Sequence, residues 1–295
     1  MDVQGWAAPM KNVWDQIAKT LVPRVLGRIT HVQSSMDIRG HVLEADLWVE
    51  PKPEHAADLE RLGMLGRMVA LGPCLIEPFS GVPAEHEIRS CILKQYSLHH
   101  DRRREAKERD QDMPPFPRLW VVSTGSPDRV IAAMDMQPMP DWPEGCLSRR
   151  PFDQLHLIVV RKLPRTRETL LIRLLSRGKT FSNAVTDLLE LRNTVPELAF
   201  LAAEVMHVLI AFKNELHEDQ LEEEEMEALR DIDAAYAEWE REVKTEENRE
   251  IIRLLCQQFE IELTDERLAQ MATWTPDQLK QALMKISAVH EWPGS

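Results

Sequence analysis

The sequence predicts a mixed α/β domain followed by an all-helical region. Three observations predict it. Short strand-like apolar runs flank one long helical pattern within residues 1–165, residues after about 164 show only helical patterns, and the two parts differ in charge. Strands interspersed with helices in one part, and helices alone in the next, are typical of a small sheet covered by helices with a separate helical region.

The charge asymmetry is large. Residues 1–180 contain 26 Lys and Arg against 23 Asp and Glu, whereas residues 181–295 contain 10 against 26, and the whole chain has a net charge of −13. The content of 43% hydrophobic and 29% charged residues is that of an ordinary folded protein. Such different halves indicate separate roles or separate partners.

The first elements follow from local periodicity. Residues 13–21 carry apolar side chains at helical spacing, and CLIEPF (74–79) is a short apolar run that predicts a strand. Residues 41–50, HVLEADLWVE, alternate between apolar and polar positions, which predicts a strand with one buried face. Its polar face is expected to carry Glu44, Asp46, Trp48 and Glu50.

A long helix is predicted within residues 81–110. Pro83 stands near its first turn, Glu85 and Glu87 follow early, and arginines accumulate late, which is the order that favours a helix start and suits the helix dipole. Strands are predicted after it at 119–125 and 154–163. The buried stripe of the helix is expected to comprise Ile88, Cys91, Ile92, Tyr96 and His99.

These patterns divide the chain into three parts: a core at 1–165, a helical extension packed on it at 166–217, and an acidic helical region at 218–295. Thr275-Pro276-Asp277-Gln278 has the form of a capping box that begins the last helix. The acidic region is expected to bind a protein partner or a second copy of the chain, or to fold back on its own domain. Its apolar stripe comprises Met226, Leu229, Ile232, Tyr236, Trp239 and Val243.

Location is inferred from what the sequence lacks. No apolar run approaches the ~18 residues that cross a bilayer, and the N-terminal residues show no basic stretch followed by an apolar one. The four cysteines are scattered without a C-x-x-C pair, which argues against a zinc site or a disulfide framework. We therefore expect a cytoplasmic protein that has no membrane partner.

Two acidic residues on neighbouring predicted strands suggest a metal site. Asp46 lies on the polar face of one strand, and Glu77 closes the apolar run of the next. Neighbouring strands lie ~4.8 Å apart, so carboxylates at facing positions can share a divalent cation. Such an ion lowers the pKa of a bound water and offsets charge on a phosphodiester.

The order of these elements resembles a known family. A helix, a strand with Asp46, a strand with Glu77, a long helix and a further strand form the layout of the PD-(D/E)XK nuclease superfamily. The chain is most similar to its recombination-promoting nuclease and transposase-like branch, over residues ~10–180. The resemblance implies a restriction-endonuclease-like core, which is a small mixed sheet flanked by helices, and a metal-dependent DNA endonuclease activity.

The resemblance also assigns residue roles. It implies that Asp46 binds the metal, that Glu77 is the glutamate of the E-x-K element, and that the carbonyl of Pro78 is a further ligand of Mg²⁺ or Mn²⁺. The lysine of that element, often glutamine in this branch, falls on Phe79. A phenyl ring donates no hydrogen bond, so this position departs from the family pattern.

A lysine on the following helix offers a replacement, as in related nucleases. Lys94 lies beside the predicted apolar stripe, on the same edge as Glu87, which provides another carboxylate. Simpler interpretations stay open: Lys94 extends along a helix flank into water, Asp46 faces solvent, and Glu77 pairs with Arg89 or a turn amide. The catalytic set predicted from the sequence is Asp46, Glu77 and Lys94.

The sequence therefore supports two functions. The first is a Mg²⁺- or Mn²⁺-dependent DNA endonuclease in which basic residues contact phosphates. The second is a nuclease-derived protein without catalysis, in which the α/β core is a scaffold and the acidic helices bind a partner. The predicted DNA contacts are Arg102, Arg103, Arg104, Arg165, Arg167, Arg173, Arg177 and Lys179.

Overall fold

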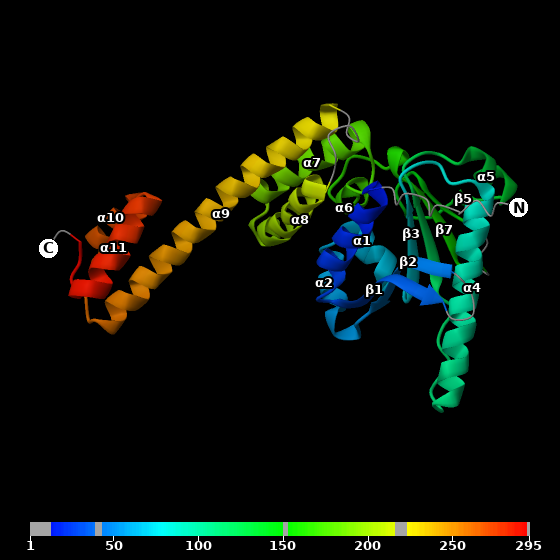
Figure 1. Cartoon of the computed structure of the whole chain (residues 1–295), viewed down its shortest axis with the longest axis horizontal. Helices are drawn as coiled ribbons and strands as arrows, with labels where there is room; N and C mark the ends of the chain where they lie inside the picture. The colour runs from blue at the N-terminus through cyan, green and yellow to red at the C-terminus, as the bar shows by residue number, and fades with distance from the viewer. Residues whose placement is uncertain (1–12, 39–42, 150–152, 216–222, 294–295) are drawn as a thin grey trace, which may run out of the picture. The chain divides into compact units, whose positions relative to one another are not determined.

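Among the described residues, a seven-stranded mixed sheet forms the centre of the first of two compact units (Figure 1). The computed structural model describes residues 13–38, 43–149, 153–215 and 223–293. The two units are Met1–Ile232 and Asp233–Ser295, and the division falls within a long helix. A mixed α/β fold followed by a helical region, as the sequence predicts, is confirmed.

The sheet has the strand order β1-β2-β3-β4-β7-β6-β5. Its first three strands form an antiparallel meander, β3, β4 and β7 are parallel, and β6 and β5 return antiparallel. The strands are β1 (Thr30–Ile38), β2 (Leu43–Pro51), β3 (Cys74–Phe79), β4 (Arg118–Ser123), β5 (Gln137–Pro138), β6 (Cys146–Ser148) and β7 (Leu155–Val159).

Helices surround this sheet. One long helix, α4, connects the parallel strands β3 and β4, and α1 packs beside β1 and against α8. The helices of the first unit are α1 (Val13–Leu26), η1 (Pro53–His55), α2 (Ala56–Glu60), α3 (Gly63–Ala70), α4 (Glu85–Glu108), α5 (Asp128–Ala133), η2 (Val160–Lys162), α6 (Leu170–Arg173), α7 (Gly178–Thr194), α8 (Pro196–Glu215) and the first part of α9 (Glu223–Gln258).

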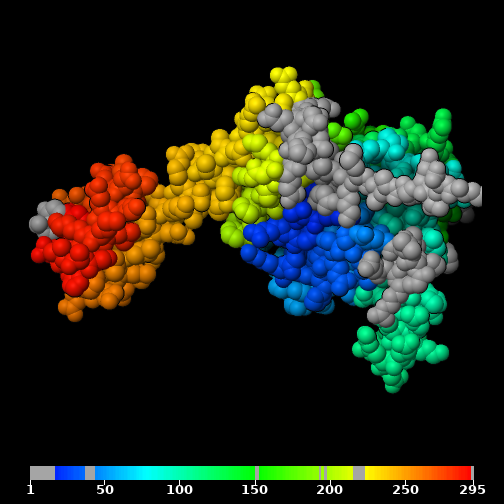
Figure 2. Space-filling model, viewed as in Figure 1, coloured from blue at the N-terminus to red at the C-terminus, as the bar shows by residue number. Residues whose placement is uncertain are grey.

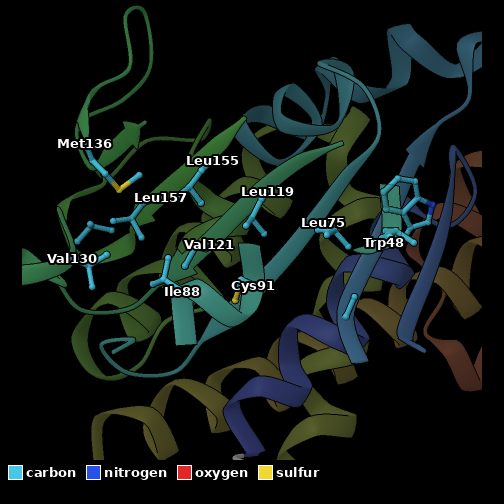
Figure 3. Packing of buried hydrophobic residues seen from close by; sticks show 13 residues of the cluster. Trp48, Leu75, Ile88, Cys91, Leu119, Val121, Val130, Met136, Leu155 and Leu157 are labelled. Carbon is cyan, nitrogen blue, oxygen red and sulfur yellow. The ribbon is translucent and has the colours of Figure 1, made fainter. Parts of the chain in front are cut away.

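The core that positions the site lies between α4 and the sheet (Figure 3). Ile88 and Cys91 project from α4 toward strand residues such as Leu119 and Val121. The helix begins as its sequence predicts, because the Glu87 carboxylate accepts a hydrogen bond from the Ala84 N–H at 2.7 Å. The buried side chains of this core include Trp48, Leu75, Leu98, Leu155, Leu157 and Val159.

The buried stripe of α4 differs from the predicted one. Ile88 and Cys91 are buried as predicted, but Tyr96 is 42% exposed and the stripe continues through Gln95 and Leu98. Gln95 is buried because its side-chain amide donates to two main-chain carbonyls, those of Pro117 at 2.8 Å and Asp153 at 3.0 Å. A polar residue with satisfied donors therefore occupies a core position that an apolar pattern does not reveal.

Two features of the meander differ from the sequence pattern. β1 carries the polar run Gln33-Ser34-Ser35 at the edge of the sheet, so its sequence lacks the alternation that predicts a strand. Alternation places Trp48 on the polar face of β2, yet it is buried because α4 covers that face and the Arg102 guanidinium lies 4.5 Å from the centre of its ring. Both faces of β2 therefore carry buried side chains.

The other face of the sheet holds a histidine in an apolar setting. His156 on β7 stacks on Trp120 of β4 with ring centres 4.2 Å apart. Neither imidazole nitrogen has a hydrogen-bond partner among the described residues. Burial, together with the positive charge of Arg118, lowers the pKa of His156 to about 4.

The second unit is a small helical assembly. The end of α9, α10 (Asp265–Thr273) and α11 (Pro276–Val289) enclose an apolar cluster that includes Ile252, Leu279 and Trp292. The capping box predicted at the start of α11 is confirmed: Thr275 and Gln278 exchange main-chain to side-chain hydrogen bonds of 2.8 and 3.3 Å. No helix in the described segments has the length and apolar character of a membrane span.

Leucines on α4 provide a test of the packing. Leu98→Ala should lower the free energy of unfolding by about 2–5 kcal/mol, because it leaves a cavity under α4. Leu93→Ala removes the same atoms from a side chain that is 49% exposed and should change it by less than about 0.5 kcal/mol. Chemical denaturation followed by circular dichroism measures both, and equal losses would contradict the packing described.

His156 predicts a dependence of stability on pH. Because its pKa is lowered in the folded state, the unfolded chain binds an additional proton as the pH falls below 6.5. Stability should fall from pH 6.5 to about 4, by roughly 2–3 kcal/mol from this group. His156→Phe should remove that part of the slope, whereas His86→Phe at an exposed position should leave it unchanged. Parallel slopes for all three proteins would refute the assignment.

Candidate active site

The register of β2 and β3 brings Asp46 and Glu77 together. The antiparallel ladder of β2 and β3 ends at the pair of Leu47 and Ile76, and Asp46 and Glu77 are the next residues beyond that pair. The Asp46 N–H donates to the Glu77 carboxylate oxygen Oε1 at 3.3 Å. The Asp46 main chain therefore contacts the Glu77 carboxylate, and a position shared by the two carboxylates stays a prediction.

Glu77 is a buried carboxylate with three polar contacts. Its side chain is 1% exposed, and Oε2 accepts a hydrogen bond from the Lys94 ammonium at 2.7 Å. The Cys91 thiol, one helical turn before Lys94 on α4, lies 3.8 Å from the same oxygen. An unpaired carboxylate at this depth would be strongly destabilising, so these contacts explain why a charged residue can occupy this position.

Burial affects the pKa values of Glu77 and Lys94 differently. Burial raises the pKa of Glu77 to about 7, the Lys94 ammonium opposes that rise, and the negative charge of Asp46 adds to it. Burial also opposes the charge on Lys94, but Glu77 outweighs it and the pKa of Lys94 is raised. The result is a carboxyl group that titrates near neutrality beside an ammonium that remains charged.

Asp46 has its own cationic partner, which the sequence did not reveal. Lys19 of α1 forms an ion pair with Asp46 Oδ1, and the same ammonium lies 3.9 Å from Glu44. The Lys19 main-chain carbonyl accepts a hydrogen bond from the Ser34 hydroxyl on β1, which ties this part of α1 to the sheet. No spacing rule connects residue 19 to residue 46, because only the packing of α1 beside the meander brings them together.

The partners of Arg89, Glu87 and Lys94 on α4 decide between the alternatives that the sequence left open for these residues. Arg89 pairs with Glu85 on the exposed face of α4 and not with Glu77. Glu87 caps the helix through the Ala84 N–H, which gives it a structural role. Lys94 ends on the Glu77 carboxylate instead of extending along the helix into water.

Phe79 occupies the position of the lysine in the E-x-K element. Phe79 packs against the core under α4, so no cation reaches the site from this strand position. Pro78 lies opposite Val122 in the parallel ladder with β4, beyond the last β2–β3 pair at Ile76. Its missing N–H therefore removes no donor from the β2–β3 ladder.

The donor set for a metal ion is small. Among the described residues, no group of three or more His, Cys, Asp or Glu side chains is arranged to hold a metal ion. Asp46 and Glu77 provide two carboxylates, and both bind lysine ammonium groups. Hard carboxylate oxygens suit Mg²⁺, which commonly uses one or two protein carboxylates and keeps several waters.

The predicted DNA contacts are distributed over two regions. Arg102 is bound to Glu50 and Arg104 to Asp101 and Glu108, while Arg103 is exposed. Arg173 is a correction: its side chain is 3% exposed and bound to Asp187, so it is a structural residue and presents no cation to a ligand. Arg165 and Arg167 are exposed ahead of α6, Arg177 lies 3.9 Å from Glu225, and Lys179 is exposed in α7.

Comparisons with protein-family models, with curated proteins and with solved structures give no match, so any functional assignment depends on the chemistry of this chain's own residues.

The Glu77–Lys94 pair predicts a specific pattern of stability. Lys94→Met leaves a buried carboxylate without its cation and should lower the free energy of unfolding by about 3–5 kcal/mol. Glu77→Gln combined with Lys94→Met removes both charges and should recover a large part of that loss. Urea denaturation of the two single variants, the double variant and the parent protein gives the coupling energy.

The exposed Glu85–Arg89 pair on the same helix is the matched control. Arg89→Met should change the free energy of unfolding by less than about 0.5 kcal/mol, because an exposed ion pair contributes little. A double variant at Glu77 and Lys94 that is no more stable than Lys94→Met would contradict the pairing.

Proposed function

We propose that this protein is a divalent-metal-dependent phosphodiesterase that cleaves DNA, with a site formed by Asp46, Glu77 and Lys94. The convergence of these three residues carries the proposal: Glu77 contacts the Asp46 main chain at 3.3 Å and the Lys94 ammonium at 2.7 Å. Two carboxylates beside one lysine are the groups that the PD-(D/E)XK resemblance implies, although the lysine comes from a helix.

The arrangement of the sheet also supports this proposal. α1, the strands β2 and β3, the connecting helix α4 and the parallel strand β4 follow one another in the order that the resemblance implies, and β1 is an additional strand between α1 and β2. Glu77 lies between β2 and β4, where both neighbouring strands fix the position of its main chain. The proposal therefore has both a fold order and a side-chain arrangement in its favour.

The donors fit a Mg²⁺ or Mn²⁺ ion in type, and Asp46 and Glu77 would hold it, with the Pro78 carbonyl as the further ligand that the resemblance implies. When bound, the ion supplies Lewis-acid charge that lowers the pKa of a water and offsets charge on the phosphodiester. The ammonium of Lys19 neutralises Asp46, so this ion pair has to open before Asp46 binds a cation.

The side chains around Glu77 would have different roles according to their positions. Lys94 is held by Glu77 at the edge of the site and presents N–H donors that orient an attacking water and stabilise negative charge. Cys91 and Phe79 form part of the apolar core behind this position, which excludes water from the far side of Glu77. Glu77 thus both positions Lys94 and contributes a carboxylate oxygen.

A second candidate function has its own observation in support. Lys19 and Lys94 balance the two carboxylates without any ion, which suits a nuclease-derived scaffold that has lost catalysis. In that case the second unit would bind the partner, through the apolar side chains that it exposes. These are Ile251 and Leu254 on α9 and Met284 and Val289 on α11.

A plasmid assay separates the two functions. The purified protein with Mg²⁺ or Mn²⁺ should convert supercoiled plasmid to the nicked form, and chelation by EDTA should stop the reaction. Asp46→Asn, Glu77→Gln and Lys94→Gln should each reduce the initial rate about 100-fold or more, because each removes a charge that acts on the reacting phosphate.

The control is Arg89→Gln, which changes an exposed residue of α4 outside the site and should cut at the parent rate. Equal background cleavage by the parent protein and the three site variants would remove the nuclease proposal and favour the scaffold.

A further inference from the structure

We propose that the outer flank of α4 binds single-stranded nucleic acid, with a base stacked at Tyr96 and Phe116 and the backbone held by Arg103 and Lys107. This inference rests on the proposed function, which makes nucleic acid the substrate, and it names the form of nucleic acid that the protein holds. The surface is separate from the candidate active site: Lys94 reaches Glu77, whereas residues two apart on a helix point about 200° away from each other.

A hollow of about 440 Å³ lies on this flank, lined by Tyr96, His99, His100, Arg103 and Phe116. Three of these residues carry rings that contact one another. Phe116 approaches both Tyr96 and His99 edge to face, with ring centres 5.0 Å apart in each pair. Tyr96 keeps 42% of its surface exposed after making this contact.

The rings suit a nucleobase better than an ion. Burial and the neighbouring Arg103 lower the pKa of His99, which disfavours the charged form of its ring. Exposed aromatic faces beside a cation bind unpaired bases of any sequence by stacking. A duplex hides the faces of its bases, so this hollow favours a single strand or an unpaired end.

Unpaired cations continue the same flank. Tyr96, His100, Arg103 and Lys107 are spaced by four, three and four residues, which places them on one side of the helix. Arg103 and Lys107 are exposed and have no ion pair with a carboxylate among the described residues. They lie one turn, about 6 Å, apart along the helix axis and can contact the backbone of a strand whose base is stacked at Tyr96.

The arginines on either side of Arg103 form ion pairs with carboxylates. Arg102 is bound to Glu50 and lies over Trp48, and Arg104 is bound to Asp101 and Glu108. The C-terminal end of α4 also extends past the sheet and stands clear of the atoms around it in this view (Figure 2). Tyr96, His100, Arg103 and Lys107 are all exposed on this flank.

Fluorescence anisotropy tests this site. A fluorescein-labelled oligothymidylate of about ten nucleotides is titrated with the full-length protein in EDTA, between about 50 and 200 mM KCl. We expect a Kd of about 100 μM or tighter at the lowest salt. Tyr96→Leu should weaken binding about fivefold or more, and Tyr96→Phe, which keeps the ring, should bind as the parent does.

The salt dependence tests the two cations separately from the ring. Arg103→Gln and Lys107→Gln should each reduce the slope of log K against log salt by about 0.7, whereas Arg104→Gln should leave the slope unchanged because its charge is already paired. Absence of binding, equal affinities for Tyr96→Leu and Tyr96→Phe, or equal slopes for the Arg103 and Arg104 variants would overturn the proposal.

The chelator keeps this result independent of catalysis. Binding with no plasmid cleavage would refute the nuclease proposal alone, and cleavage without loss of binding in Tyr96→Leu would refute the stacking site alone.

Discussion

The ion pair between Glu77 and Lys94 is the interaction on which the arrangement of the site depends. A carboxylate that is 1% exposed requires both hydrogen-bond donors and a cation, because the cost of removing it from water is several kcal/mol. Both come from packing: the Asp46 N–H is supplied by the neighbouring strand and the ammonium by α4. The register of β2 on β3 and the rotation of α4 over the sheet must therefore be correct together.

The supply of the cation by α4 explains why Phe79 can differ from the lysine of the family pattern. When the cation arrives from the helix, the strand position two residues after Glu77 is free to carry an apolar side chain, and Phe79 joins the core under α4. Lys19 performs for Asp46 what Lys94 performs for Glu77, from the helix that precedes the meander. Each of the two carboxylates therefore has a lysine partner, with which a metal ion would have to compete.

The sequence predicted the parts of this protein that depend on local pattern. The order of helix, strands and connecting helix, the start of α4 and the capping box at Thr275 are confirmed, because periodicity and capping residues lie within a few positions of one another. The partnership of Lys19 with Asp46 and the burial of Gln95 were missed, since both depend on groups distant in sequence. β1 was missed because its polar edge lacks alternation.

Anomalous diffraction from crystals of the protein grown with Mn²⁺ tests the proposed metal site most directly. We expect a manganese peak beside the carboxylates of Asp46 and Glu77, with the Lys19 ammonium moved away from Asp46 and Lys94 still bound to Glu77. A map without a peak there, in which Lys19 remains on Asp46 at saturating Mn²⁺, would contradict it and leave a charge-balanced structural site.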